Sequence, residues 1–204
     1  MTSGRVQKIR SHSLWCAAAV AMGLGAATVG AAETTGPWTV AQLMQALSAV
    51  EKSRARFVER KYLQVLTSPL ESSGTLSYVA PGQLEKRTLK PKPEVWIVRG
   101  DRLTIETGGR RRELGLSDYP VLQAFVESLR GTLGGDIAAL ERFYKVELEG
   151  NEARWQLYLA PLDRKMNRVI SLIRIAGSAA RLSLVEVQEA KGDRTVMKIY
   201  EEAS

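Results

Sequence analysis

The feature of this sequence that most constrains its fold is a repeated alternation of apolar and polar residues, which begins near Ala55 and continues almost to the C-terminus. Alternation with a period of two is typical of a strand with one buried face and one solvated face. Turn signals containing glycine or proline separate the runs, and most connections are short. The pattern therefore predicts a meander of about ten antiparallel strands, and the fold class is α+β, mainly β.

The expected strands end at identifiable breaker residues. Pro81 and Gly82 form one turn signal, and a polar connection over residues 163–167 separates two later strands. Between Leu184 and Val185 the alternation changes phase, which predicts a bulge or a stretch buried on both faces. The strands are expected over residues 54–66, 75–78, 83–90, 95–98, 103–105, 110–114, 144–149, 155–159, 169–175, 182–188 and 196–200.

Helical spacing appears in two places. Thr39 and Gln42 have the spacing of a capping box at the start of a helix. Asp118 is the expected N-cap of a mid-chain helix with Pro120 in its first turn, and a short helix is expected next, over residues 136–143. The apolar stripe of the first helix contains Val40, Leu43, Met44 and Leu47, and that of the mid-chain helix contains Leu122, Phe125, Val126 and Leu129.

So few helices cannot cover both faces of such a large sheet. One face is therefore expected to be solvated, and the other to curl around an interior, with the two helical stripes as lids. Taken singly, each apolar residue of the inner face is an ordinary core residue, but together they are candidates for the wall of an apolar cavity. These candidates are Leu76, Tyr78, Leu84, Trp96, Val98, Leu103, Ile105, Leu157 and Leu159.

The N-terminus has the composition of a secretory signal peptide. Three cations and no acid precede an uncharged run from Leu14 to Gly30, which small residues follow up to Ala32. We expect cleavage after Ala32, export to the periplasm, and one domain over residues 33–204. The run is short and rich in alanine and glycine, so an uncleaved membrane anchor is the less favoured alternative.

The only histidine and the only cysteine, His12 and Cys16, lie inside this leader. The exported chain would then lack the residues of serine–histidine and cysteine nucleophiles and of nearly every zinc site. We find no phosphate-binding glycine loop and no calcium-loop spacing, so no metal and no cofactor are expected. Carboxylates such as Glu147 and Glu186 fall at solvent-face positions of their strands, which makes a carboxylate-dependent hydrolase the least favoured hypothesis. An exported chain of mild charge is not expected to bind nucleic acid, and the arginine triplet over residues 110–112 is expected to be a solvated turn or strand end.

Several short stretches carry a family resemblance through their order and spacing, over about residues 38–200. The first helix leads into a strand that contains Phe57, and a later strand ends at Pro81. The other stretches are Ser73-Gly74-Thr75-Leu76, Val95 to Asp101, Trp155 to Pro161 and Leu182 to Asp193. In this arrangement the chain resembles the periplasmic outer-membrane lipoprotein carrier (LolA-like) family. The resemblance implies an incomplete barrel that helices close around a cavity for acyl chains.

The resemblance implies a monomeric periplasmic carrier that takes a lipoprotein or lipid from an inner-membrane donor toward an outer-membrane acceptor. Such carriers usually have an arginine just before the strand-ending proline, which helps the lid to close, but here Ala80 precedes Pro81. The sequence therefore leaves two alternatives for the cargo: a lipoprotein, or another lipid or acylated product. The alternative from a different class is an envelope interaction protein with a solid core.

Overall fold

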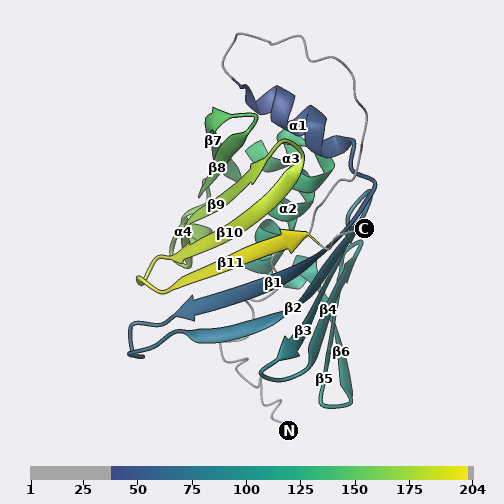
Figure 1. Cartoon of the computed structure of the whole chain (residues 1–204). Helices are drawn as coiled ribbons and strands as arrows, with labels where there is room; N and C mark the ends of the chain where they lie inside the picture. Colours follow the sequence, from purple (N-terminus) through teal and green to yellow (C-terminus); the bar gives the residue numbers. More distant parts are fainter. Residues whose placement is uncertain (1–37, 202–204) are drawn as a thin grey trace, which may run out of the picture.

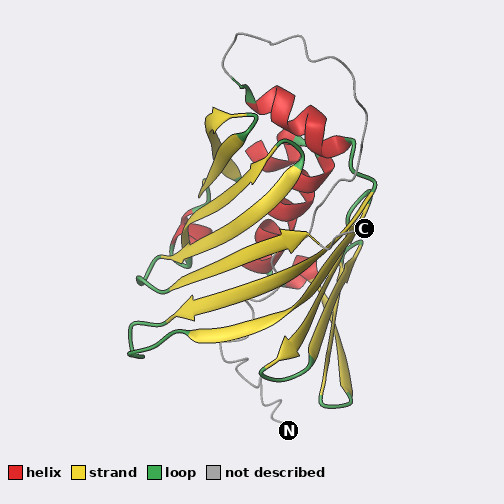
Figure 2. Ribbon diagram, in the orientation of Figure 1, coloured by secondary structure: helices red, strands yellow, loops and turns green. Residues whose placement is uncertain are grey.

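The computed structural model describes residues 38–201, which form one curved antiparallel sheet of eleven strands with helices gathered on its concave side (Figures 1 and 2). This confirms the mainly β incomplete barrel, with eleven strands where about ten were expected. The signal peptide predicted over residues 1–32 lies outside the described residues. Within residues 38–201, no helix has both the length and the apolar character needed to cross a membrane.

The strand order across the sheet is β6-β5-β4-β3-β2-β1-β11-β10-β9-β8-β7. Apart from β6 and β7, strands adjacent in the chain are adjacent in the sheet, and the pairing of β1 with β11 joins the two halves of the meander. The strands are β1 (Lys52–Tyr62), β2 (Leu70–Val79), β3 (Gln83–Lys90), β4 (Glu94–Arg99), β5 (Arg102–Thr107), β6 (Arg110–Gly115), β7 (Tyr144–Asn151), β8 (Arg154–Pro161), β9 (Ile170–Ser178), β10 (Arg181–Glu189) and β11 (Arg194–Glu201).

The two end strands of the sheet, β6 and β7, are consecutive in the chain, and the segment between them holds most of the helical residues. β6 and β7 do not pair with each other, so the described barrel is open along this side. The helices are α1 (Val40–Ser48), η2 (Leu116–Asp118), α2 (Pro120–Gly134), α3 (Ile137–Glu141) and α4 (Arg164–Asn167). Because η2, α2 and α3 connect the two free edges, the chain itself directs these helices across the open side.

The alternation along each strand separates the two faces of the sheet, as β1 illustrates. Ala55 and Phe57 are buried on the concave face, whereas Arg54 and Arg56 are exposed on the convex face. The strand is shorter than the expected 54–66, because its last partner on β11 is Arg194, opposite Tyr62. Beyond that point the chain has no ladder to join and turns into β2.

The predicted bulge occurs on β10, but slightly earlier than expected. The register between β10 and β9 shifts between Leu182 and Leu184, so Ser183 is the extra residue. Leu182 and Val185 can therefore both be buried on the concave face although they are three positions apart.

The start of α1 follows the prediction and the start of α2 does not. The backbone amide of Thr39 donates to Gln42 Oε1 at 2.8 Å, and the amide of Gln42 donates to Thr39 Oγ1 at 3.3 Å, which confirms the capping box. The prediction of Asp118 as N-cap was wrong, because Asp118 belongs to η2 and Tyr119 occupies the N-cap without a side-chain bond. Pro120 at the first helical position has no amide proton that needs a cap, so the helix begins there without one.

Candidate functional site

The nine cavity candidates all lie on the concave face of the sheet, as the strand register shows. Tyr78 lies opposite Leu84 on β3, and Val98 lies opposite Leu103 on β5. Seven of the nine come from β2 to β5, and the remaining two come from β8 on the other flank of β1. All are buried except Ile105, which is partly buried against the same core.

The two helical stripes pack into the same apolar cluster. On α1, Leu43, Met44 and Leu47 are buried, and Val40 is partly buried. On α2 all four expected residues, Leu122, Phe125, Val126 and Leu129, are buried. The structure thus brings the predicted lid residues and the predicted wall residues together in one continuous contact region.

The concave face also carries an ion pair that sequence reasoning missed. Lys86 Nζ on β3 lies 2.8 Å from Glu59 Oε2 on β1, and each of the two side chains is 3 % exposed. The Lys86 ammonium also lies 4.8 Å from the centroid of the Phe57 ring. A signal was present, because Glu59 continues the buried phase of Phe57 and Lys86 continues that of Leu84.

The polar character extends to neighbouring strands. Ser72 Oγ on β2 donates to Glu59 Oε1 at 3.2 Å, and Trp96 Nε1 on β4 donates to Glu94 Oε1. Burial raises the pKa of Glu94, with the nearby Lys86 ammonium acting in the opposite direction. We call Glu59, Ser72, Lys86 and Glu94 the polar seam. It places charge inside a face that is mainly apolar, so a ligand on this face would meet both apolar and polar groups.

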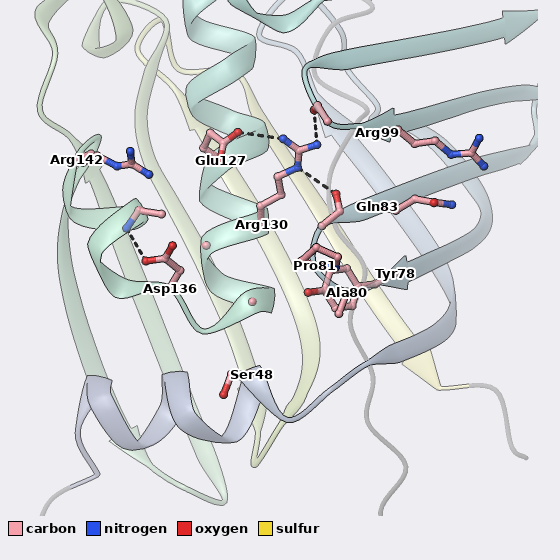
Figure 3. Close-up of a pocket in the computed structure, with 15 residues that line it drawn as sticks. Ser48, Tyr78, Ala80, Pro81, Gln83, Arg99, Glu127, Arg130, Asp136 and Arg142 are labelled. Atoms are coloured by element: carbon pink, nitrogen blue, oxygen red, sulfur yellow. Dashed lines mark hydrogen bonds and ion pairs between the residues drawn. The ribbon is translucent and has the colours of Figure 1, made fainter.

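A pocket of about 770 Å³ opens where α2 and α3 approach the β2–β3 and β4–β5 turns (Figure 3). Of the nine wall candidates, only Tyr78 lines it. Ala80 and Pro81 line it too, so the position before the strand-ending proline is part of this opening. The pocket is therefore located at the junction between the helical cover and the sheet.

Arg130 bridges this junction (Figure 3). Its Nε donates to the carbonyl oxygen of Gly82 at 3.1 Å, and its Nη2 donates to the carbonyl oxygen of Gly100. Its Nη1 donates to Glu127 Oε1 one turn back on α2, at 3.1 Å, which orients the guanidinium. One side chain of α2 thus holds the β2–β3 turn and the β4–β5 turn at once, and we call these contacts the Arg130 latch.

Sequence reasoning did not find Arg130. It lies one residue after Leu129, at the end of the apolar stripe, and both of its partners on the sheet are backbone carbonyls. Every residue type has a backbone carbonyl, so a sequence pattern cannot indicate which carbonyl oxygens a side chain contacts. Only the packing of α2 over the turns reveals this contact.

A half-open sheet with an apolar concave face under helices defines a class of proteins that can hold an apolar ligand. The sequence model of the outer membrane lipoprotein carrier protein LolA-like family matches residues 31–200, and the chain therefore belongs to this family. Curated proteins include no match to the sequence.

Solved structures with a similar fold include a LolA superfamily protein from Nitrosomonas europaea, at 10 % identity and a TM-score of 0.45, with 81 % of this chain and 94 % of that chain covered. The lipoprotein LppX from Mycobacterium tuberculosis is similar at 8 % identity and a TM-score of 0.42, with 80 % of this chain and 93 % of that chain covered. The family membership rests on the sequence match alone.

Proposed function

We propose that this protein is an exported carrier that binds acyl chains of a lipoprotein or another lipid on its concave face and takes part in their transport to the outer membrane. The observation that carries the proposal is the single apolar cluster shared by the wall residues and the lid residues inside an open sheet. Since the helices bridge the two free edges, they can move away without breaking a strand pair. The protein is then a periplasmic binding protein rather than an enzyme, formed by residues 33–204 after loss of its leader.

The energetics favour a site that helices fill when cargo is absent. Burial of a sixteen-carbon chain is worth up to ~13 kcal/mol at about 0.8 kcal/mol per methylene, and a carrier that retained all of this could not release its cargo. Side chains such as Phe125 and Leu129 are buried against the sheet in this structure. Cargo must displace them, so the lost helix packing offsets part of the binding free energy.

The Arg130 latch supports this cycle. Opening of the cover separates the guanidinium from the carbonyl oxygens of Gly82 and Gly100. A hydrogen bond from a charged donor contributes about 1.5–3 kcal/mol, which is large enough to keep the cover closed and small enough for cargo to overcome. In this chain, the cation at the β2–β3 turn comes from α2 and compensates for Ala80, which lies in that turn.

The direct test is photo-crosslinking with benzoyl-phenylalanine in place of tyrosine. Tyr78 lies on the concave face, and Tyr158 on β8 lies on the convex face between Leu157 and Leu159, so the two variants form a matched pair. We expect lipid or lipoprotein adducts at Tyr78 in the native envelope, and none at Tyr158. Native preparations free of lipid, together with no binding of a fluorescent fatty acid, would instead support an interaction protein with a solid core.

A further inference from the structure

Five connections of the sheet lie together at the end opposite the Arg130 latch. They are the β1–β2, β3–β4, β5–β6, β8–β9 and β10–β11 connections, because antiparallel strands return alternately to the same end. In Figure 1 they run from α4, past the β10–β11 and β1–β2 turns, to the tips of the hairpins β3–β4 and β5–β6. We call this end the basic rim and define it as residues 63–70, 90–93, 108–110, 162–169 and 190–193.

Large apolar side chains are exposed on this rim. Val65 is 87 % exposed and Leu70 is 54 % exposed, and Leu66 between them is exposed as well. Leu162 adds a fourth exposed apolar side chain beside α4. Only two other large apolar side chains of the described residues, Leu89 and Tyr200, are exposed to this degree, and both lie outside the rim. The concentration of four such side chains on the rim indicates a contact surface rather than scattered surface residues.

Hydrogen bonds hold the β1–β2 turn in place, so the exposure of these side chains does not result from a loosely held turn. The amide of Gln64 donates to Asp193 Oδ1 at 3.0 Å, and Gln64 Nε2 donates to the carbonyl oxygen of Lys191 at 2.8 Å. The β10–β11 turn is bonded in turn to the β8–β9 connection, where the amide of Ala190 donates to the carbonyl oxygen of Val169 at 3.0 Å. Three connections are thus joined into one surface.

Cations surround the apolar side chains. Among the described residues, seven exposed cations of the rim have no ion-pair partner within 4.0 Å: Lys90, Lys92, Arg110, Arg164, Lys165, Arg168 and Lys191. The two acids of the rim, Asp163 and Asp193, accept hydrogen bonds from backbone amides. The rim therefore presents apolar tips within a positive surface, which is complementary to a bilayer with anionic head groups.

We propose that the basic rim docks this protein on an anionic lipid bilayer, with Val65, Leu66 and Leu70 inserted at the level of the head groups and the cations around them on phosphates. The Arg130 latch then lies at the end of the sheet away from the membrane. This docking is independent of whether the concave face holds acyl cargo.

The experiment is co-sedimentation of the purified protein with phosphatidylglycerol-containing vesicles and with pure phosphatidylcholine vesicles. We expect binding to the anionic vesicles that weakens as salt is raised, and little binding to the neutral ones. The V65S/L66S variant tests the apolar tips, and the triple variant K90Q/K92Q/R110Q should bind about 100-fold more weakly, since each lost charge near such a surface costs about fivefold.

The matched control is L89S, because Leu89 is as exposed as Leu70 but lies outside the basic rim as defined above. Binding that is equal in V65S/L66S and L89S, or no binding to anionic vesicles at low salt, would overturn the proposal and leave the rim as a surface for an acidic protein. Fluorescent fatty-acid binding by the same variants separates the two proposals. Unchanged cargo binding with lost vesicle binding supports the docking site, whereas vesicle binding without any cargo binding overturns only the carrier function.

Discussion

Replacement of Glu59 by glutamine should strongly destabilise the fold, because it leaves the Lys86 ammonium without the carboxylate that lies 2.8 Å away. The Lys86 side chain is only 3 % exposed, so water cannot solvate the ammonium group in place of the Glu59 carboxylate. Loss of one partner from such a buried pair costs about 3–5 kcal/mol. At about 2–4 °C per kcal/mol for a domain of this size, the melting temperature should fall by about 6–20 °C.

The double variant E59Q/K86M should recover most of this loss, because neither member of the buried ion pair is then charged. Urea unfolding followed by circular dichroism gives the free energy of unfolding of the wild type, both single variants and the double variant. The control is E147Q, which removes the exposed pair between Lys145 and Glu147, 2.7 Å apart, and should leave stability unchanged. The reasoning is refuted if E59Q is as mild as E147Q, or if the double variant is less stable than either single one.

Three further predictions concern the cover and the seam. R130M should accelerate uptake of a fluorescent fatty acid in stopped-flow measurements, whereas R142M, which alters the same pocket, should not; equal rates would exclude the latch. G135A should lower stability more than G108A: both glycines have positive φ, but a Cβ on Gly135 would lie 2.2 Å from the Met44 carbonyl oxygen and one on Gly108 meets nothing within 4 Å. Left-handed backbone costs roughly 1–2 kcal/mol for alanine, so G108A measures that cost and the excess in G135A measures the contact with α1. Burial raises the pKa of Glu94, so the folded state holds its proton more tightly than the unfolded chain and this contribution to stability is lost as pH rises through the folded pKa. Urea unfolding should accordingly show E94Q more stable than the wild type at pH 7 and little changed at pH 4. A lower free energy of unfolding for E94Q than for the wild type at pH 7 would contradict the direction of the pKa shift.

Local patterns predicted the elements of this fold well. The strand Gln83–Lys90 agrees with its expected range, because alternation and flanking prolines are local signals. The capping box of α1 was equally predictable, since Thr39 and Gln42 are neighbours on one helical turn. The start of α2 was not predictable in this way. Aspartate is a residue type that favours the N-cap, but Asp118 lies in the preceding helical turn, η2. Propensity alone does not distinguish two adjacent turns.

Contacts between distant elements could not be predicted in the same way. Arg130 reaches carbonyl oxygens 48 and 30 residues away, and any residue type presents a carbonyl. The sequence shows Glu59 and Lys86 as charged residues at strand positions where the alternation predicts burial. Their pairing, however, depends on the register of β1, β2 and β3. The exposed tips of the basic rim are likewise separate in sequence and share one surface only because strand direction alternates.

By itself, the sequence determined which residues alternate, where the chain turns, and that the two apolar helical stripes must be buried somewhere, because these properties depend on neighbours a few positions away. Only the tertiary structure decided that the sheet stays open between β6 and β7, that α2 crosses the opening, and that a cation from the helix holds the turns beside Ala80. These outcomes depend on how far the sheet curls and on which backbone groups a helix meets as it packs, and no local pattern encodes either.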